Sequence, residues 1–309
     1  MLVEKISLSD CDTYKDVFVR FIYENNRDYR SVEPKDTEAA YELFSEMKSE
    51  IRNDTAIVYG AMHNGKLVGF IWASKRSFRE DNSRMFLNIM CVDDEYKTPL
   101  VFEHLLNTVQ KEAKHMGYKA LFVYEEMSKV DKISFYKKVG FEIERIQLVK
   151  TLTGEEVRKK GLVASPEFIA ENLSSFAKLH EENIHAHILT ENFSYNDAVE
   201  TMHKIIQYLK DGKASVYYES NEENIVGMIW IHPYRNMGED RMHLSSIVVK
   251  AEYKGNAYGQ KLFSAVYDEM ITKGFSTIYT NVDAINSYAA KFYYKQGFVD
   301  EAYQMIINL

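Results

Sequence analysis

Small residues separate a predicted strand from a predicted helix near residue 255. Residues 251–262 read AEYKGNAYGQKL, after the apolar run IVV and before the helix-like stretch LFSAVYDEMITKG. A strand that enters a helix in this way leaves backbone N–H groups free at the helix N-terminus, where the helix dipole favours an anion such as phosphate. Gly255, Ala257 and Gly259 would let a ligand approach the main chain, and Lys254 adds a positive charge. The alternative is a turn whose glycines serve only tight packing.

Two common phosphate-binding motifs do not fit this stretch. In a P-loop, four residues separate the two glycines and a Lys-Ser or Lys-Thr pair follows, whereas Gly255 and Gly259 are closer and Lys261 precedes Leu262. The glycines also fail to match the G-x-G-x-x-G pattern of dinucleotide-binding folds. A nucleotide-phosphate-binding module is therefore disfavoured.

A second motif lies after the predicted strand STIYTNVD. Residues 286–298 read NSYAAKFYYKQGF and are predicted to form a helix that ends at Gly297. Together with IVVKAEYKGNAYGQKL, this motif resembles the GNAT superfamily of acyl-CoA-dependent acetyltransferases, in which a loop patterned [RQ]-x-x-G-x-[GA] holds the CoA pyrophosphate. Lys254, Ala257 and Gly259 match the three patterned positions. Lys254 replaces Arg or Gln and keeps the charge without the guanidinium fork, and Ala257 replaces the first Gly.

The resemblance implies acetyl-CoA as co-substrate, no metal, and a role for individual residues. The backbone of the strand would pair with the pantetheine arm, the loop would hold the pyrophosphate, and Asn286 would bond the arm near its thiol end. Tyr293 would protonate the departing thiolate as general acid, although it is also readable as a core aromatic, and Tyr294 is the neighbour most easily confused with it. The implied cofactor-binding residues are Ile247, Val248, Val249, Lys254, Gly255, Asn256, Ala257, Tyr258, Gly259, Gln260 and Asn286.

The implied reaction is direct attack of a primary amine on the thioester. The enzyme must align both partners, stabilise the developing oxyanion and accept a proton. By family analogy the backbone N–H of Val249 would donate to the oxyanion. The base is open, because the strand that leads to the loop reads MHLSSIVV: His243, with the ordinary histidine pKa in the useful range, or Ser245 would act directly or through water, and a structural histidine is the alternative.

The chain contains two copies of one pattern. VGFIW at 68–72 returns as VGMIW at 226–230, EYK at 95–97 returns at 252–254, and FYKKVGF at 135–141 returns as FYYKQGF at 292–298. The first pair is 158 residues apart and the others 157. Such regular spacing indicates a tandem repeat.

Each copy is predicted to hold an initial strand, a helical region, a hairpin, a third strand, and then helix, strand, helix and final strand. Hairpins require antiparallel strands, and the strand–helix–strand passage implies a parallel pair. The expected fold is α/β (α+β), with two GNAT-like domains that each have a mixed, mostly antiparallel twisted sheet flanked by helices. The expected domains are 1–150, a connecting segment with a helix from about Pro166 over 151–183, and 184–309, with HAHILT as the first strand of the second copy.

The first copy lacks the features of the loop. Thr98, Pro99 and Phe102 stand where the second copy has Gly255, Asn256 and Gly259, and Lys129 stands where it has Asn286. Proline has no N–H to donate, and Phe102 is expected to fill space that a ligand would need. We therefore expect residues 1–150 to be a degenerate copy and residues 184–309 to hold the single active site.

Composition excludes several classes of protein. The net charge of -8 argues against a nucleic-acid-binding face, and Cys11 and Cys91 form neither a disulfide framework nor a zinc site. No signal peptide and no membrane-spanning run is predicted, so a cytoplasmic protein is expected, as a monomeric pseudo-dimer or a homodimer. The acidic balance favours a cationic amine acceptor, either a small molecule or a peptide. The leading function is an N-acetyltransferase, and the alternative is a non-catalytic acyl-CoA-binding or regulatory protein.

Overall fold

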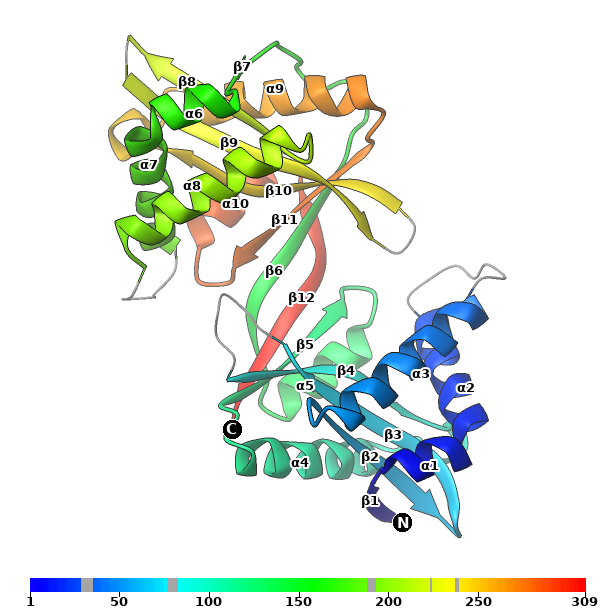
Figure 1. The fold of residues 1–309 in the computed structure, drawn as a ribbon. Helices are drawn as coiled ribbons and strands as arrows, with labels where there is room; N and C mark the ends of the chain where they lie inside the picture. Colours follow the sequence, from blue (N-terminus) through cyan, green and yellow to red (C-terminus); the bar gives the residue numbers. More distant parts are fainter. Residues whose placement is uncertain (29–35, 77–82, 188–192, 223, 237–238) are drawn as a thin grey trace. The chain divides into compact units, whose positions relative to one another are not determined.

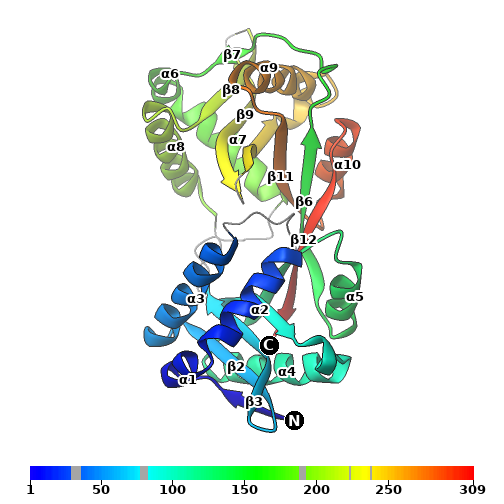
Figure 2. The same cartoon turned by 90° about the vertical axis from the view of Figure 1, so that its right-hand side faces the viewer.

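The computed structural model describes residues 1–28, 36–76, 83–187, 193–222, 224–236 and 239–309. The chain divides into two compact units, one of residues 1–144 with 302–309 and one of residues 145–301. We call them unit 1 and unit 2. Each has a mixed sheet with helices on both faces, which confirms the expected fold class (Figures 1 and 2).

Unit 1 begins with a short strand and three helices, and a hairpin then starts the main sheet. Its sheet has the order β1-β2-β3-β4-β5-β12. All neighbouring pairs are antiparallel except β4 with β5. The elements are β1 (Leu2–Lys5), α1 (Leu8–Thr13), α2 (Lys15–Asp28), α3 (Asp36–Arg52), β2 (Ala56–His63), β3 (Lys66–Lys75), β4 (Arg84–Val92), α4 (Pro99–His115), β5 (Ala120–Glu126), α5 (Val130–Lys138) and β12 (Val299–Asn308).

Unit 2 repeats this order with a sheet arranged β6-β11-β10-β9-β8-β7. The parallel pair is β10 with β11, and the other neighbours are antiparallel. The elements are β6 (Glu142–Thr151), β7 (Leu162–Val163), α6 (Pro166–Glu171), α7 (Leu173–His187), α8 (Tyr195–Lys210), β8 (Ser215–Asn221), β9 (Asn224–Asn236), β10 (Glu239–Val249), α9 (Tyr258–Lys273), β11 (Thr277–Asp283) and α10 (Ser287–Lys295).

The second copy begins earlier than its sequence suggested. We expected residues 151–183 to be a connection, but they contain β7, α6 and most of α7, which correspond in order to β1, α1 and α2. The predicted strand HAHILT is wrong in its described part, because residues 185–187 end α7; residues 188–190 lie outside the described residues. The error has a physical origin: β7 is only two residues long and gives almost no alternating pattern to detect.

The final strand of each copy completes the sheet of the other unit. After α5 the chain continues into β6, which pairs with β11 from Thr151↔Thr277 to Arg145↔Asp283. After α10 the chain continues into β12, which pairs with β5 from Ala302↔Glu126 to Asn308↔Ala120. The expected domains 1–150 and 184–309 therefore differ from the compact units, because the two copies exchange their last strands.

The sheet of unit 2 is covered by apolar side chains on both faces. One face packs against α9 and α10, with Phe263, Val266 and Met270 of α9 buried. The other face packs against the helices α6, α7 and α8. In α8 the capping box of Ser194 and Asp197 fixes the helix start, and Met202 and Ile205 are buried on the sheet side. We call the face that packs against α9 and α10 the α9 face, and the face that packs against α6, α7 and α8 the α7 face.

Candidate active site

The loop before α9 has the backbone conformation that its small residues suggested. A short 3-10 turn covers Ala251–Tyr253, and α9 begins at Tyr258. Gly255 has φ +88° and Ala257 has φ +59°, both in the left-handed region. Glycine adopts this region without strain, whereas alanine occupies it at a cost of about 1–2 kcal/mol. The loop therefore turns sharply just before α9 begins.

Several N–H groups of this loop are available to a ligand. The first intrahelical bond of α9 runs from the N–H of Lys261 to the carbonyl of Ala257, at 3.0 Å. In the described structure, no protein acceptor bonds the N–H groups just before it, and the loop is largely exposed. The five groups are those of Gly255, Ala257, Tyr258, Gly259 and Gln260. N–H groups arranged in this way at a helix N-terminus can bind an anion such as a pyrophosphate.

Gly259 lies close to an aromatic ring, as the packing alternative for the glycines of this loop allows. A Cβ added there would lie 3.0 Å from Cζ of Phe292, so the missing side chain makes room for an aromatic ring of α10. In unit 1 the corresponding Phe102 lies beside Phe135, with ring centroids 5.9 Å apart. Phe102 thus contacts Phe135, the residue of unit 1 that matches Phe292. That Phe102 also fills space which a ligand would need stays a prediction. At Gly255, by contrast, an added Cβ would meet no atom within 4 Å.

The strands β10 and β11 separate beside this loop. Their parallel pairing covers Met242↔Ile278 and His243↔Tyr279, and within the described residues it does not continue. The N–H of Lys250 bonds the carbonyl of Val226 on β9 at 2.9 Å. Because N–H directions alternate along a strand, those of Ile247 and Val249 point toward the side of β11. We call this separation of β10 and β11 the splay. Within the described residues, the expected pantetheine-binding strand β10 thus has an unpaired edge at the splay.

Tyr293 reaches the splay, and Tyr294 does not. The ring of Tyr293 is buried against Phe263 and Phe298, and its hydroxyl interacts with Thr280 on β11. Burial raises the pKa of Tyr293 to about 12, although the hydrogen bond with Thr280 opposes this shift. The phenol is therefore protonated at neutral pH, which an acid requires.

The two alternatives for Tyr293 are resolved in part by these contacts. Tyr294 is 43% exposed and donates to Asp300 at 2.7 Å, away from the splay. Tyr293 belongs to the core, as the alternative reading held, but its polar tip lies at the strand junction. Thr280 there donates to the carbonyl of Leu244 at 2.9 Å, which takes the place of a ladder bond.

Asn286 caps the helix that carries Tyr293. Its side-chain oxygen accepts from the N–H of Ala289 at 3.0 Å, so it is the N-cap residue of α10. An N-cap of this type stabilises a helix by about 1 kcal/mol. The capping bond uses the oxygen and leaves the amide nitrogen as a donor. In unit 1 the equivalent Lys129 makes no side-chain capping bond.

His243 lies on the α7 face of β10 in a cluster of aromatic rings. Its Nδ1 lies 2.9 Å from Nε2 of His232 on β9 and 3.3 Å from Oγ of Ser245. Its ring stacks on Tyr279 with centroids 4.6 Å apart. Burial, His232 and Arg145 lower the pKa of His243 to about 3. This corrects the expectation of an ordinary pKa, and it keeps the imidazole neutral at pH 7.

Sequence reasoning missed two residues of this site. His232 and Thr280 gave no motif signal, because each acquires its role from a strand neighbour that is distant in sequence. A register calculation for the β9–β10 hairpin would have paired His232 with His243. The two residues between β9 and β10 in the sequence, 237 and 238, read Met-Gly and are not a strong turn motif of the Asn-Gly type, so the sequence offers no basis for that register.

The corresponding loop of unit 1 differs in conformation. The N-cap residue Thr98 has φ -125° and ψ 151°, Pro99 opens α4, and no residue from 93 to 102 has a positive φ. The buried Tyr136 matches Tyr293, but Val123 stands in place of Thr280. Unit 1 therefore keeps the core tyrosine and lacks both the sharp turn and the polar partner.

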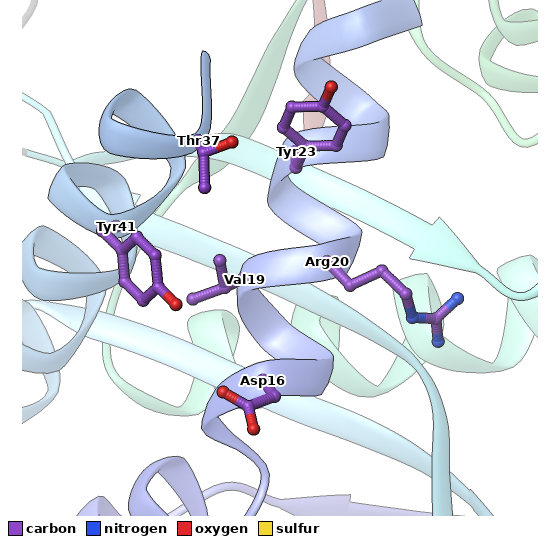
Figure 3. A pocket seen from close by; sticks show the side chains of 6 residues that line it. All are labelled: Asp16, Val19, Arg20, Tyr23, Thr37 and Tyr41. Carbon is purple, nitrogen blue, oxygen red and sulfur yellow. The ribbon is translucent and has the colours of Figure 1, made fainter. Parts of the chain in front are cut away.

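Unit 1 has a surface pocket between α2 and α3, with a volume of about 250 Å³. Figure 3 shows Tyr41 and Thr37 on one side of it and Tyr23 and Arg20 on the other. The guanidinium of Arg20 donates to Asp93 at 2.6 Å. The pocket belongs to the helical layer rather than to the parallel strand pair, and it holds none of the predicted site residues.

The described residues contain neither a metal-binding group nor a membrane-spanning helix. No group of three or more histidine, cysteine, aspartate or glutamate side chains there is arranged to hold a metal ion. Among the described helices, none combines the length and the apolar character that crossing a lipid bilayer requires.

Comparison with known proteins identifies the family. The sequence model of the Acetyltransferase (GNAT) family matches residues 19–141 and again residues 183–298, which together are more than half of the chain. A comparison with curated proteins found no match.

Solved structures with the same fold cover nearly the whole chain. An acetyltransferase of the GNAT family from Colwellia psychrerythraea is 14% identical with a TM-score of 0.55, and the alignment covers 100% of both chains. A GCN5-related N-acetyltransferase from Sphaerobacter thermophilus is 12% identical with a TM-score of 0.61, covering 99% of this chain and 95% of that one. A tandem GNAT protein from the clavulanic acid biosynthesis pathway is 11% identical with a TM-score of 0.54, covering 99% and 98%. The chain therefore belongs to the GNAT acetyltransferase family and contains the fold of that family twice.

Proposed function

We propose that the chain is an N-acetyltransferase with one active site, in unit 2, which transfers the acetyl group of acetyl-CoA to a primary amine. The observation that carries the proposal is the coincidence of three features. The loop before α9 offers free N–H groups, β10 and β11 separate beside it, and the hydroxyl of Tyr293 meets Thr280 at that separation. Unit 1 shows the strand separation without the other two features.

Acetyl-CoA would supply the activated acyl group, and the residues of unit 2 would hold and orient it. The N–H groups of Gly255 and of residues 257–260 would bind the pyrophosphate, with Lys254 beside them. The backbone of Ile247–Val249 would pair with the pantetheine arm, and the amide of Asn286 would donate to it near the thiol. This arrangement uses groups for which the described residues supply no hydrogen-bond partner, so binding would break no hydrogen bond among those residues.

The chemical step requires a hydrogen-bond donor, an acid and a base. The N–H of Val249 would stabilise the oxyanion that develops on the thioester carbonyl. Tyr293 would give its phenolic proton to the departing thiolate, and its position at Thr280 directs the hydroxyl toward the splay. His243 would accept the proton of the attacking amine as a neutral imidazole with a free lone pair. Its low pKa makes it a weak base, so the proton would have to pass onward from its ring.

Calorimetry on the intact chain tests the single site. We expect one equivalent of acetyl-CoA per chain, because the loop of unit 1 has no left-handed residue and begins its helix with Pro99. A stoichiometry near two would refute the assignment of a single site and would show that unit 1 binds the same ligand.

Thiol release in the presence of a panel of primary amines tests the reaction. Tyr293→Phe should lower kcat roughly tenfold to a thousandfold, the range of general acid–base contributions, with little change in CoA affinity. Tyr136→Phe is the matched control in unit 1 and should leave kcat unchanged. Tight CoA binding without transfer to any amine would favour the non-catalytic acyl-CoA-binding alternative.

A further inference from the structure

The side chain of His232 gives His243 a defined hydrogen-bond partner. His232 and His243 face each other across the antiparallel strands β9 and β10. Nδ1 of His232 lies 3.1 Å from the carbonyl oxygen of Pro233, and Nε2 of His232 lies 2.9 Å from Nδ1 of His243. These contacts form a continuous chain from a backbone carbonyl through two imidazoles.

The carbonyl fixes the direction of this chain. A carbonyl oxygen only accepts hydrogen bonds, so Nδ1 of His232 carries the proton. Neutral His232 then has a lone pair on Nε2, and Nδ1 of His243 must be the donor to it. The oxygen of Ser245, at 3.3 Å from the same nitrogen, is placed to accept a share of that N–H. In neutral His243 the remaining nitrogen, Nε2, is therefore unprotonated.

We propose that His232 is a positioning residue that holds His243 in the Nδ1–H tautomer, so that Nε2 of His243 is the atom that accepts the proton of the acceptor amine. The role of His232 in catalysis rests on the proposed acetyl transfer. The hydrogen bond between His232 and His243 does not depend on that proposal. No atom of the described residues makes a hydrogen bond to Nε2 of His243.

The pair also provides a route for the proton. The amine N–H bond breaks as a bond to Nε2 of His243 forms, and His243 becomes an imidazolium. His243 then passes its Nδ1 proton to Nε2 of His232, which restores a neutral His243 with its remaining proton on Nε2. His232 becomes the imidazolium and loses a proton to water. A further exchange with water returns His243 to its starting tautomer, so the net result is one proton moved from the amine to the solvent.

The surroundings of His243 favour its neutral form between turnovers. The burial of the ring and the positive charge of Arg145 oppose its protonation. Passing the proton to His232 removes the charge from the ring on which burial and Arg145 act. The titratable or charged groups around His243 are His232 and Tyr234 on β9, Arg241 on β10, Tyr279 and Asp283 on β11, Arg145 on β6, and Glu301 on β12, which pairs with Arg241.

Unit 1 shows that the fold does not require the histidine pair. Ser74 and Phe86 occupy the facing positions of β3 and β4 that correspond to His232 and His243. Phe86 packs on Phe122, with ring centroids 5.1 Å apart, as His243 packs on Tyr279. The same sheet position is thus filled by an apolar ring in the copy that lacks the loop conformation, and by paired imidazoles in the copy that has it.

The tautomer is measurable on the intact chain without any substrate. In a two-bond ¹H–¹⁵N correlation spectrum of histidine-labelled protein at pH 8, we expect His243 in the Nδ1–H form, with its signals assigned by their loss in His243→Gln. His232→Phe removes the acceptor and should shift His243 toward the Nε2–H form that a free imidazole prefers in water. His232→Gln places an amide oxygen near the former Nε2 and should preserve the Nδ1–H form. A wild-type His243 in the Nε2–H form would overturn the proposal.

Kinetics then test the role in transfer. His232→Phe should lower kcat at least tenfold with unchanged acetyl-CoA affinity, and His232→Gln should recover part of that loss because it preserves the tautomer without relaying the proton. His203→Gln, at an exposed position of α8, is the control and should change neither measurement. Equal kcat for His232→Phe and the wild type would also overturn the proposal. Absence of transfer in the wild type, with His243 in the Nδ1–H form, would refute the proposed function and still support the hydrogen-bond assignment.

Discussion

His180 predicts a measurable loss of stability of unit 2 in mild acid. It lies on α7, is 7% exposed, and packs edge-on against Phe193 with ring centroids 5.7 Å apart. Its Nδ1 is buried without a hydrogen-bond partner among the described residues. Burial lowers the pKa of His180 to about 4, because the folded protein offers the imidazolium no compensation for lost water.

The sign of the effect follows from the direction of this shift. An unfolded histidine has a pKa of about 6.5, so the unfolded chain binds a proton between pH 6.5 and pH 4 that folded His180 refuses. The free energy of unfolding therefore falls as pH decreases through this window. Between pH 7 and pH 5 the contribution of His180 falls by about 2 kcal/mol, as the linkage relation gives for pKa values of about 4 and 6.5.

The assay uses the tryptophan content of the chain. Of its two tryptophans, Trp72 lies in unit 1 and Trp230 in unit 2. A Trp72→Phe background thus gives urea unfolding curves that report on unit 2 alone. In this background the free energy of unfolding should fall between pH 7 and pH 5 by about 2 kcal/mol less in His180→Leu than in its parent. This difference does not depend on how stable the variant is at pH 7. His203→Leu, at an exposed site on α8, should keep the parental dependence. An unchanged pH dependence in His180→Leu would refute the assignment of a neutral, buried His180.

Two further predictions concern the loop before α9. Because Ala257 has φ +59°, Ala257→Gly should relieve strain and change the stability of unit 2, measured by urea unfolding, by no more than about 1 kcal/mol in either direction. Ala257→Val should weaken CoA binding, measured by calorimetry, at least tenfold. Unchanged CoA affinity in the valine variant would contradict the role of this turn. Because a Cβ at position 259 would lie 3.0 Å from Phe292, Gly259→Ala should cost about 1–3 kcal/mol of stability. Phe292→Leu replaces the ring by a smaller side chain and, combined with Gly259→Ala, should recover part of that loss; additive effects in this double-mutant cycle would show that the two positions are not in contact.

The sequence by itself determined the repeat, the fold class and the position of the sharp loop before α9. These features are encoded by residues that are close together in the chain. The offsets between VGFIW and VGMIW and between the two EYK segments reveal the duplication, and Lys254–Gly259 encode their own turn because left-handed conformations need small residues. The helix boundaries at Gly274 and Gly297 follow from the same local chemistry.

The tertiary structure alone decided features that depend on partners distant in the sequence. The exchange of β6 and β12 is one, because a strand's own pattern of side chains does not specify which sheet it joins. The start of the second copy at β7 is another, since two residues gain strand geometry only through pairing with β8.

The chemistry of individual side chains was decided in the same way. Tyr293 and Tyr294 are adjacent in sequence, yet one is buried beside Thr280 and the other is exposed beside Asp300. The neutral state of His243 and its bond to His232 arise from burial and strand register. Burial and register are properties of the packed sheet, and a pKa or a tautomer follows from them rather than from the residue type.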